Sequence, residues 1–271
     1  MWLIGVLTLL IVGAALTVAL GWTPRATPGP PLWDIAKLGA SSATSFGGFA
    51  GFSLASAIFV AGLEAARTSP TFATVFGMML VGFLVLVIAS WIAGSAPSAS
   101  QSDGASAMSL ELALGNLCGN LGIAVTWLAL APLTTLIGLP TLAAALVWPL
   151  LFMGLAAGGW AALIAHRVTR ARTTACVAIP VLGMGLPAVY RLVAVSRWPA
   201  LWPTSEPALH FAFVALGMAA VMLVLHFALL IAYGRNEAQQ RLRMVGHRLM
   251  LVVAQVYALV VGLLWCAVAV P

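Results

Sequence analysis

The feature that most constrains this chain is residues 112–165, which contain no Asp, Glu, Lys, Arg or His. Soluble domains carry about 25% charged residues, whereas this chain is 7% charged and 63% hydrophobic. A surface so poor in charge cannot face water, so we expect lipid to be the solvent. Apolar runs of about 20 residues are typical of transmembrane helices, because a helix rises about 1.5 Å per residue and the hydrocarbon core is about 30 Å thick.

The apolar runs predict an all-α fold, a polytopic transmembrane helical bundle that forms a single integral membrane domain over residues 1–271. A β-barrel would instead show segments of about 10 residues with alternating polarity, and no such alternation is present. The first span lacks the basic segment of a cleaved signal peptide, so we expect it to be retained. Small polar residues at 95–106 predict a loop. The eight predicted spans are 2–21, 40–63, 71–92, 108–133, 142–164, 175–195, 209–233 and 249–269.

The basic residues predict how the spans are oriented. The chain has 12 Lys and Arg against 6 Asp and Glu. Basic residues gather in cytoplasmic loops, and an external N-terminus places most of them inside. Both termini are therefore predicted on the outer, periplasmic side of a bacterial inner membrane. Anionic membrane lipids account for the basic inner face, so no nucleic-acid partner is expected. The predicted inner residues are Arg25, Lys37, Arg167, Arg170, Arg172, Arg235, Arg241, Arg243 and Arg248, and the outer ones are Arg67, Arg191 and Arg197.

The fourth span begins with the segment LALGNLCGNLG at 112–122, directly after Glu111. Helical spacing puts Asn116 and Asn120 on one stripe, about a quarter-turn from a second stripe that allows close backbone approach. Two interpretations of the asparagines stay open: interhelical hydrogen bonds worth about 1 kcal/mol each, or a polar site for a substrate, an ion or a cofactor. Glu111 lies near the predicted inner boundary, where water would solvate it. The second stripe consists of Glu111, Gly115, Gly119 and Gly122.

Three further segments are candidates for function. Ser45 belongs to a hydroxyl-rich start of the second span that either lines a cavity or packs closely. Arg191, near the outer end of the sixth span, either reaches the lipid head groups or binds an anionic group or a quinone. The sixth span also carries two prolines and two glycines at 180–187, which predict either a plain kink or a functional break.

His226 is the candidate cofactor ligand. It lies inside the seventh span, on the same helical face as Met218 and Met222. Histidine and methionine ligate haem and also suit copper, so haem, copper or no cofactor at all are the alternatives, together with quinone near Arg191. In the cofactor-free interpretation, His226 bonds one neighbour and the methionines fill the core.

The leading functional hypothesis is a transporter, permease or channel-like protein for a small neutral or weakly charged solute. The second and fourth spans would form the path and the broken sixth span the gate. One alternative is the membrane anchor subunit of a redox complex, and another is a structural or assembly subunit that binds other membrane subunits. No common catalytic motif is present, which disfavours an enzyme. The predicted substrate-binding residues are Glu111, Asn116, Asn120, Ser45 and Arg191.

Overall fold

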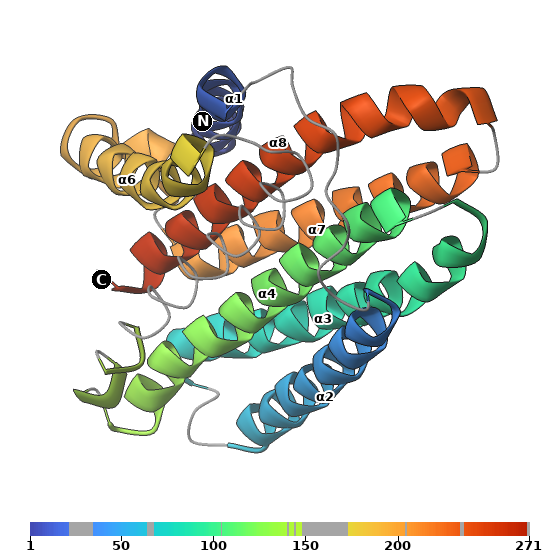
Figure 1. Cartoon of the computed structure of the whole chain (residues 1–271). Coiled ribbons are helices and arrows are strands. Elements are labelled where there is room, and N and C mark those ends of the chain that lie inside the picture. Colours follow the sequence, from blue (N-terminus) through green and yellow to red (C-terminus); the bar gives the residue numbers. More distant parts are fainter. Residues whose placement is uncertain are drawn as a thin grey trace.

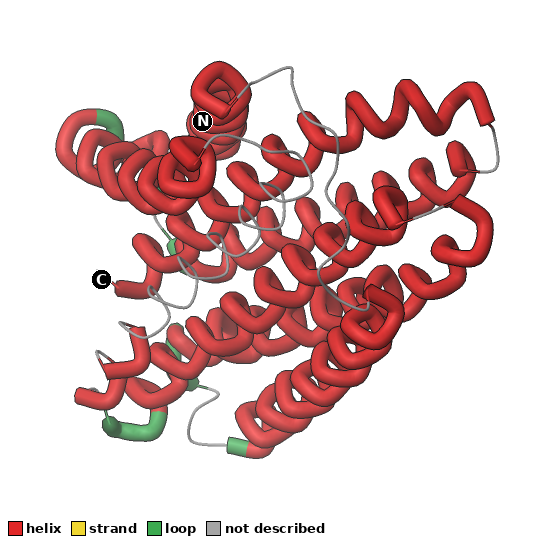
Figure 2. The backbone as a smooth tube through the Cα atoms, viewed as in Figure 1, coloured by secondary structure: helices red, strands yellow, loops and turns green. Residues whose placement is uncertain are grey.

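Every regular element in the described part of the chain is a helix (Figure 2). The computed structural model describes residues 1–21, 35–63, 68–103, 105–139, 141–143, 145–147, 173–203, 205–233 and 236–269. The all-α prediction is confirmed for these residues. The helices are α1 (Trp2–Gly21), α2 (Ile35–Gly62), α3 (Thr71–Asp103), α4 (Ala105–Leu136), α6 (Thr173–Arg197), the 3₁₀ helix η2 (Pro199–Leu201), α7 (Pro207–Tyr233) and α8 (Asn236–Ala269).

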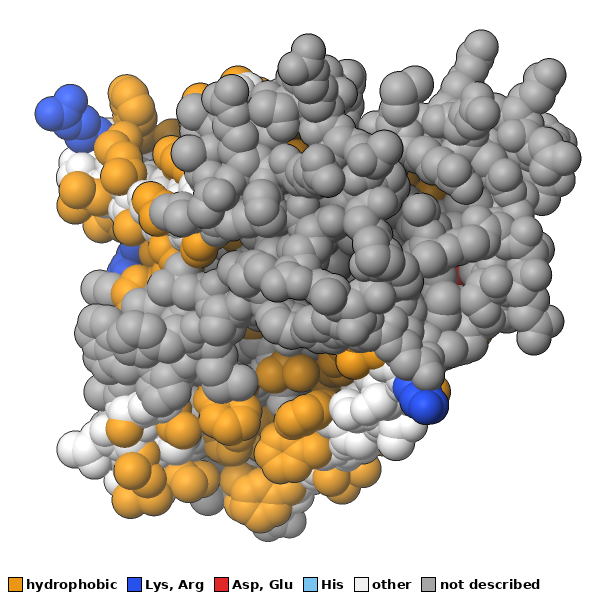
Figure 3. Space-filling model, in the orientation of Figure 1, with side chains coloured by type: hydrophobic (Ala, Val, Ile, Leu, Met, Phe, Trp, Pro, Cys, Tyr) orange, Lys and Arg blue, Asp and Glu red, His pale blue; other side chains and the backbone are white. Residues whose placement is uncertain are grey.

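Seven of the described helices are long and apolar enough to cross a membrane. They correspond to seven of the eight predicted spans. The remaining prediction, at 142–164, lies almost entirely outside the described residues. On the face drawn in Figure 3, the described surface is largely hydrophobic over its lower part, and Lys and Arg appear only near its margins. Exposed Phe52, Ile58 and Phe59 on α2 belong to this apolar exterior, which suits lipid.

Three helices extend beyond the predicted spans by five residues or more at one end. α3 continues to Asp103, so the loop predicted at 95–106 is wrong for most of its length. α2 begins at Ile35 rather than at 40, and α8 begins at Asn236 rather than at 249. Hydropathy identifies the lipid-facing part of a helix, whereas helical hydrogen bonding continues through the Glu, Ala, Gln and Arg residues that precede it in α8, all of which favour helix.

The sixth span is a continuous helix and not a broken one. Pro180 and Pro187 both lie inside α6, so the prediction of a helix break that acts as a gate is wrong. The associated glycines serve close packing instead. A Cβ on Gly262 of α8 would overlap the carbonyl oxygen of Gly183 and lie 2.9 Å from Cγ of Pro187. Two glycines thus let the backbones of α6 and α8 meet.

The helices form two groups (Figure 1). The first group consists of α2, α3 and α4, and the second of α1, α6 and α8. α7 contacts α3, α4 and α8 and so joins the two groups. α3 packs against α2, α4 and α7, whereas α8 packs against α1, α4, α6 and α7. α4 and α8 bury the largest shares of their membrane-length segments. These two helices therefore form the interior of the bundle, and α1 and α2 lie at its periphery.

Paired contacts fix the relative directions of the helices. Gly115 lies against Ala93 and Gly122 against Leu86, so α3 and α4 are antiparallel. On α3 and α7, Gly77 lies against Leu209 and Ser95 against His226, so these two helices are parallel. α4 therefore runs opposite to α7.

Contacts also fix the directions of α6, α7 and α8. Gly183 of α6 lies against Ala258 of α8, and Arg191 bonds Cys266 two turns later, so α6 and α8 are parallel. α7 and α8 follow each other directly and run in opposite directions in Figure 1. Since α4 and α8 both run opposite to α7, α4, α6 and α8 share one direction.

Both described ends of the chain lie at the same end of the bundle. The hydroxyl of Tyr190 lies 3.5 Å from the carbonyl oxygen of Trp2. The next residue, Arg191, donates a hydrogen bond to Cys266 near the end of α8. Consecutive residues of α6 thus contact the first turn of α1 and the last turns of α8.

Candidate functional site

The strongest candidate site is a cluster of Ser95 on α3, Glu111 on α4 and His226 on α7. The Nδ1 atom of His226 lies 3.7 Å from Oε1 of Glu111. The other ring nitrogen, Nε2, lies 3.0 Å from the hydroxyl oxygen of Ser95. The cluster therefore joins three helices, and it unites Glu111 and His226, which the sequence analysis nominated separately and for different roles.

The carboxyl group of Glu111 is sealed from solvent. Its exposed fraction is 0%, so the prediction that water solvates it is wrong. Within the described part of the chain, neither of its oxygens has a hydrogen-bond partner. A buried carboxylate without partners is costly, since burying a charge requires pairing, hydrogen bonding or neutralisation. The charge of the Glu111 carboxyl group therefore depends on the nearby imidazole of His226.

The hydrogen bonds of Ser95 orient the imidazole. Its hydroxyl donates to the carbonyl oxygen of Ile92 at 2.8 Å, so its oxygen accepts from Nε2–H of His226. In the neutral ring, Nδ1 then carries a lone pair that faces Glu111. A single proton placed between Oε1 and Nδ1 neutralises the acid or forms a carboxylate–imidazolium pair, and net charge is zero in both cases.

Local sequence explains how Glu111 reaches this position. Gly115, one turn further along α4, sits against α3 so closely that a Cβ there would lie 3.1 Å from the backbone nitrogen of Ala93. Gly119 faces Phe46 of α2 and Gly122 faces Leu86 of α3 in the same way. The predicted glycine stripe therefore packs α4 onto its neighbours, and this close approach brings Glu111 to the level of Ser95 on α3.

Asn116 and Asn120 lie on a different face of α4, apart from the cluster. Both are half-buried, as are Ile123 and Trp127 further along the same face. No hydrogen bond joins either amide to any residue that the structure describes. Their predicted role in binding therefore stays a prediction.

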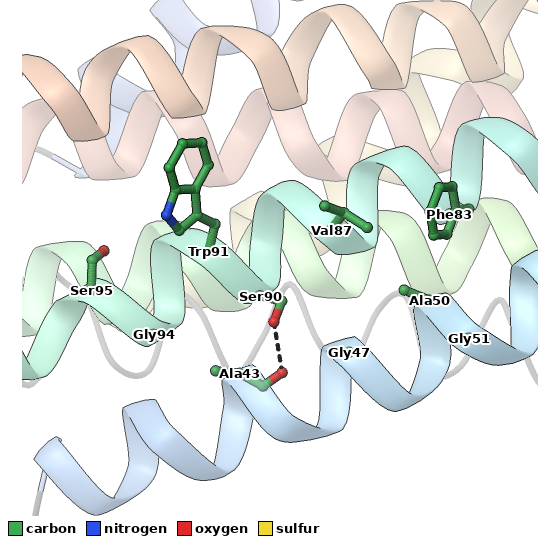
Figure 4. Close-up of a pocket in the computed structure, with 10 residues that line it drawn as sticks. All are labelled: Ala43, Gly47, Ala50, Gly51, Phe83, Val87, Ser90, Trp91, Gly94 and Ser95. Carbon is green, nitrogen blue, oxygen red and sulfur yellow. Dashed lines mark hydrogen bonds between the residues drawn. The ribbon is translucent and has the colours of Figure 1, made fainter.

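An open groove of about 820 Å³ runs between α2 and α3 (Figure 4). Small residues of α2 form one wall, and Phe83, Val87 and Trp91 of α3 contribute to the other. Across it, the hydroxyl of Ser90 donates to the carbonyl oxygen of Ala43 at 2.9 Å. Ser95 also lines the groove, but its hydroxyl points away from α2 in Figure 4, and it contacts His226.

Ser45 is exposed on α2 and is not among the residues that line the groove. The structure therefore gives it no contact with the cluster. Met218 and Met222 are buried in the core, as the cofactor-free interpretation of α7 expects. No group of three or more His, Cys, Asp and Glu residues suited to a metal occurs among the described residues.

Arg191 lies at the opposite end of the bundle from Glu111. Its Nη1 donates to the carbonyl oxygen of Cys266 at 2.6 Å, and its guanidinium lies 5.6 Å from the ring centroid of Trp202. The last carbonyls of a helix lack intrahelical partners, and a cation there complements the helix dipole. Arg191 thus caps α8.

Three polar contacts between helices, buried or half-buried, were not predicted from the sequence. Ser95 was assigned to a loop. Ser53 of α2 donates to the carbonyl oxygen of Met79 at 2.7 Å and lies 3.1 Å from the hydroxyl of Thr126. The hydroxyl of Thr17 lies 2.7 Å from Oε1 of Gln255, which joins α1 to α8. A polar residue on the same helical face as glycines, as Thr126 is with Gly122, is the available signal.

The described helices form a bundle, and seven of them have the length and apolar composition of the spans of a polytopic membrane protein. Comparisons of the chain with protein-family models, with curated proteins and with solved structures gave no match.

Proposed function

We propose that this protein is a permease of the bacterial inner membrane that carries a small neutral or weakly charged solute. The observation that supports it best is the Glu111–His226 pair at the junction of three helices. Ionisable residues inside membrane spans are costly and mark ion, proton and substrate pathways. A purely structural helix contact has no need of an acid whose oxygens lack hydrogen bonds within the described structure.

Asn116 and Asn120 are the proposed contacts for the solute. Their amides offer uncharged donors and acceptors on a half-buried face of α4. They are not used by the described neighbours, which leaves them available to a polar solute. This donor set suits a neutral or weakly charged molecule better than a strongly charged one, because neither amide supplies a compensating charge.

The proposed topology has eight crossings with both termini outside. α4 and α6 run in the same direction, so two spans of one membrane in this order require the chain between Leu136 and Thr173 to return to the starting side. The excess of basic residues in the proposed inner loops orients the bundle. Both ends of the described chain share one end of the bundle, in agreement with an even number of crossings.

Reporter fusions test this topology. Alkaline phosphatase, which is active outside, and green fluorescent protein, which is fluorescent inside, would be fused after residues 139, 172 and 271. We expect phosphatase activity at 139 and 271 and fluorescence at 172. The same reporter active at 139 and 172 would overturn the eight-crossing proposal.

The transport proposal is tested with the full chain reconstituted in liposomes. Uptake of a panel of radiolabelled neutral and weakly charged solutes would be compared among the wild type, Asn116→Leu and Asn120→Leu. We expect flux of at least one solute, and its loss in both variants while each still elutes as a folded species. Full flux in both variants, or no flux above empty liposomes for the whole panel, contradicts the proposal.

The redox-anchor alternative finds less support. Both ring nitrogens of His226 face protein groups, namely Ser95 and Glu111, whereas a haem ligand needs one nitrogen directed at iron. The visible absorption spectrum of the purified protein discriminates the two classes. A Soret band that disappears in His226→Ala would favour the anchor, and a colourless protein would exclude haem.

A further inference from the structure

We infer that Glu111 and His226 form a one-proton binding site that couples the proposed permease to the proton gradient. The carboxyl oxygen and the imidazole nitrogen face each other at 3.7 Å, inside the bundle and away from solvent. The coupling rests on the proposed function, whereas the proton site itself rests only on this geometry.

The two groups face no other titratable partner in the described structure. Of the α3 side chains that the structure describes, Ser95 is the one that contacts His226. On α4, α7 and α8, no contact joins Glu111 or His226 to the remaining titratable side chains. The thiol of Cys118 bonds the carbonyl oxygen of Val85, and His210 bonds the carbonyl oxygen of Glu206 at the far end of α7. Among the side chains that the structure describes on these helices, the remaining titratable ones are Cys118, His210, Tyr257 and Cys266.

The proton balance of the site follows from its low dielectric. With one proton, the pair is either a carboxylic acid beside a neutral imidazole or a carboxylate beside an imidazolium, and both have zero net charge. Removal of this proton breaks one O–H or N–H bond and leaves a lone buried carboxylate. That state is costly in an apolar interior, so water must reach the site to accept the proton, and rebinding follows when the site closes.

The position of the site suits such exchange. Ser95 and Glu111 lie at one end of the membrane-length segments of α3 and α4, opposite to the chain ends, and the proposed topology makes this the inner side. Ser95 also lines the groove between α2 and α3.

Infrared difference spectroscopy tests the proton site without any transport. The full chain in lipid nanodiscs would be titrated, and the C=O stretch of a protonated carboxylic acid would be followed. We expect a pH-dependent carboxylic band that is lost in Glu111→Gln and kept in Glu206→Gln, a matched acid at the opposite end of the bundle. The same band in Glu111→Gln as in the wild type, or no titrating band, would overturn the inference.

A second variant keeps this test decisive if Glu111→Gln does not fold. Glu111→Asp retains an acid but moves it away from His226. We expect the carboxylic band to remain and its titration midpoint to shift. An unchanged midpoint and frequency in Glu111→Asp would show that the titrating acid is another residue.

Transport measurements then separate the coupling from the proposed function. In liposomes with an imposed pH gradient, we expect wild-type protein and His210→Gln to accumulate solute. We expect Glu111→Gln and His226→Gln to exchange it without response to the gradient. A titrating Glu111 without any solute flux would refute the permease and leave the proton site intact. Flux that is indifferent to pH in the wild type would refute the coupling and leave the permease intact.

Discussion

Two ionisable residues of this bundle, the half-buried Arg191 and the buried Glu111, have opposite surroundings. Arg191 has a carbonyl oxygen at 2.6 Å and the indole of Trp202 beside its guanidinium. Glu111 is fully buried, yet neither of its oxygens accepts a hydrogen bond from a described residue. Its nearest charged or titratable neighbour in the described structure is an imidazole at 3.7 Å. One charge has a permanent backbone partner, and the other has a partner that is itself titratable.

The difference separates a structural charge from a functional one. A cation on the last carbonyls of a helix stabilises that helix in every protonation state near neutrality, since arginine does not lose its proton. An acid that faces histidine changes its charge whenever one proton moves. Substitutions at the two residues should therefore have different effects. Those near Arg191 should lower the stability of the fold, and those near Glu111 should change its response to protons.

The largest loss of stability is expected from Gly262→Ala, which disturbs the contact of α8 with α6 near Arg191. The new Cβ would meet the backbone of Gly183 and Cγ of Pro187, so α6 and α8 must separate and Arg191 loses Cys266. Overpacking of this kind costs about 1–3 kcal/mol, and the loss of the Arg191 bond to Cys266 adds to this cost. Thermal unfolding in detergent measures it, with Gly217→Ala as the control, because nothing lies within 4 Å of a Cβ at Gly217. Equal melting temperatures for the two variants would show that the contact of α6 with α8 adapts freely.

Arg191→Met is expected to follow. It keeps an apolar stem but removes the bond to Cys266, and hydrogen bonds to charged groups contribute about 1.5–3 kcal/mol. The carboxylic infrared band should stay as in the wild type. Arg197→Met, at the exposed end of α6, is the control with little expected effect. A lost band in Arg191→Met would mean that the two ends are coupled and that the division proposed above is wrong.

Ser95→Ala is expected to cost about 1 kcal/mol, the net value of a typical hydrogen bond. The imidazole of His226 then loses its anchor at Nε2 and rotates more freely. We expect the midpoint of the carboxylic band to shift while the band persists. Ser90→Ala, which removes the bond to Ala43 on the groove surface, should leave the midpoint unchanged. Identical shifts in both variants would indicate a general effect on α3.

Glu111→Gln is expected to change stability least, by less than about 1 kcal/mol, because it replaces a costly buried acid with a neutral amide of similar shape. Yet it should abolish the proton response completely. Arg191→Met should have the opposite effects, a loss of stability with an unchanged proton response. Unfolding of Glu111→Gln at the temperature where Arg191→Met unfolds would assign Glu111 a structural role like that of Arg191.

Sequence patterns predicted the spans and the glycine stripe of α4 because both depend on neighbours along the chain. Apolar length gives a span directly, and Gly115, Gly119 and Gly122 share a face by helical spacing. The site was less accessible. Ser95 sits where apolarity ends although the helix continues, so it was placed in a loop. The meeting of Glu111 with His226 depends on how α4 packs beside α7, which local periodicity does not contain.

The error in α6 has a similar origin. Pro180 and Pro187 each remove a backbone donor, and local chemistry alone predicts a weakened helix. Packing decided otherwise, because Gly183 and Gly262 bring α8 against α6 at this level. The pair of glycines that looked like part of a break is the reason for a tight contact.

The short separation of α3 and α4 along the sequence has a consequence for how the protein is made. A single residue separates Asp103 from Ala105, and the two helices are antiparallel and closely packed. They can therefore leave the translocation machinery as one helical hairpin. In that order of events, α3 covers the glycine face of α4 before α6, α7 and α8 are synthesised. The side of Glu111 that faces α3 is then covered first. Its partner His226 arrives only when α7 has been synthesised.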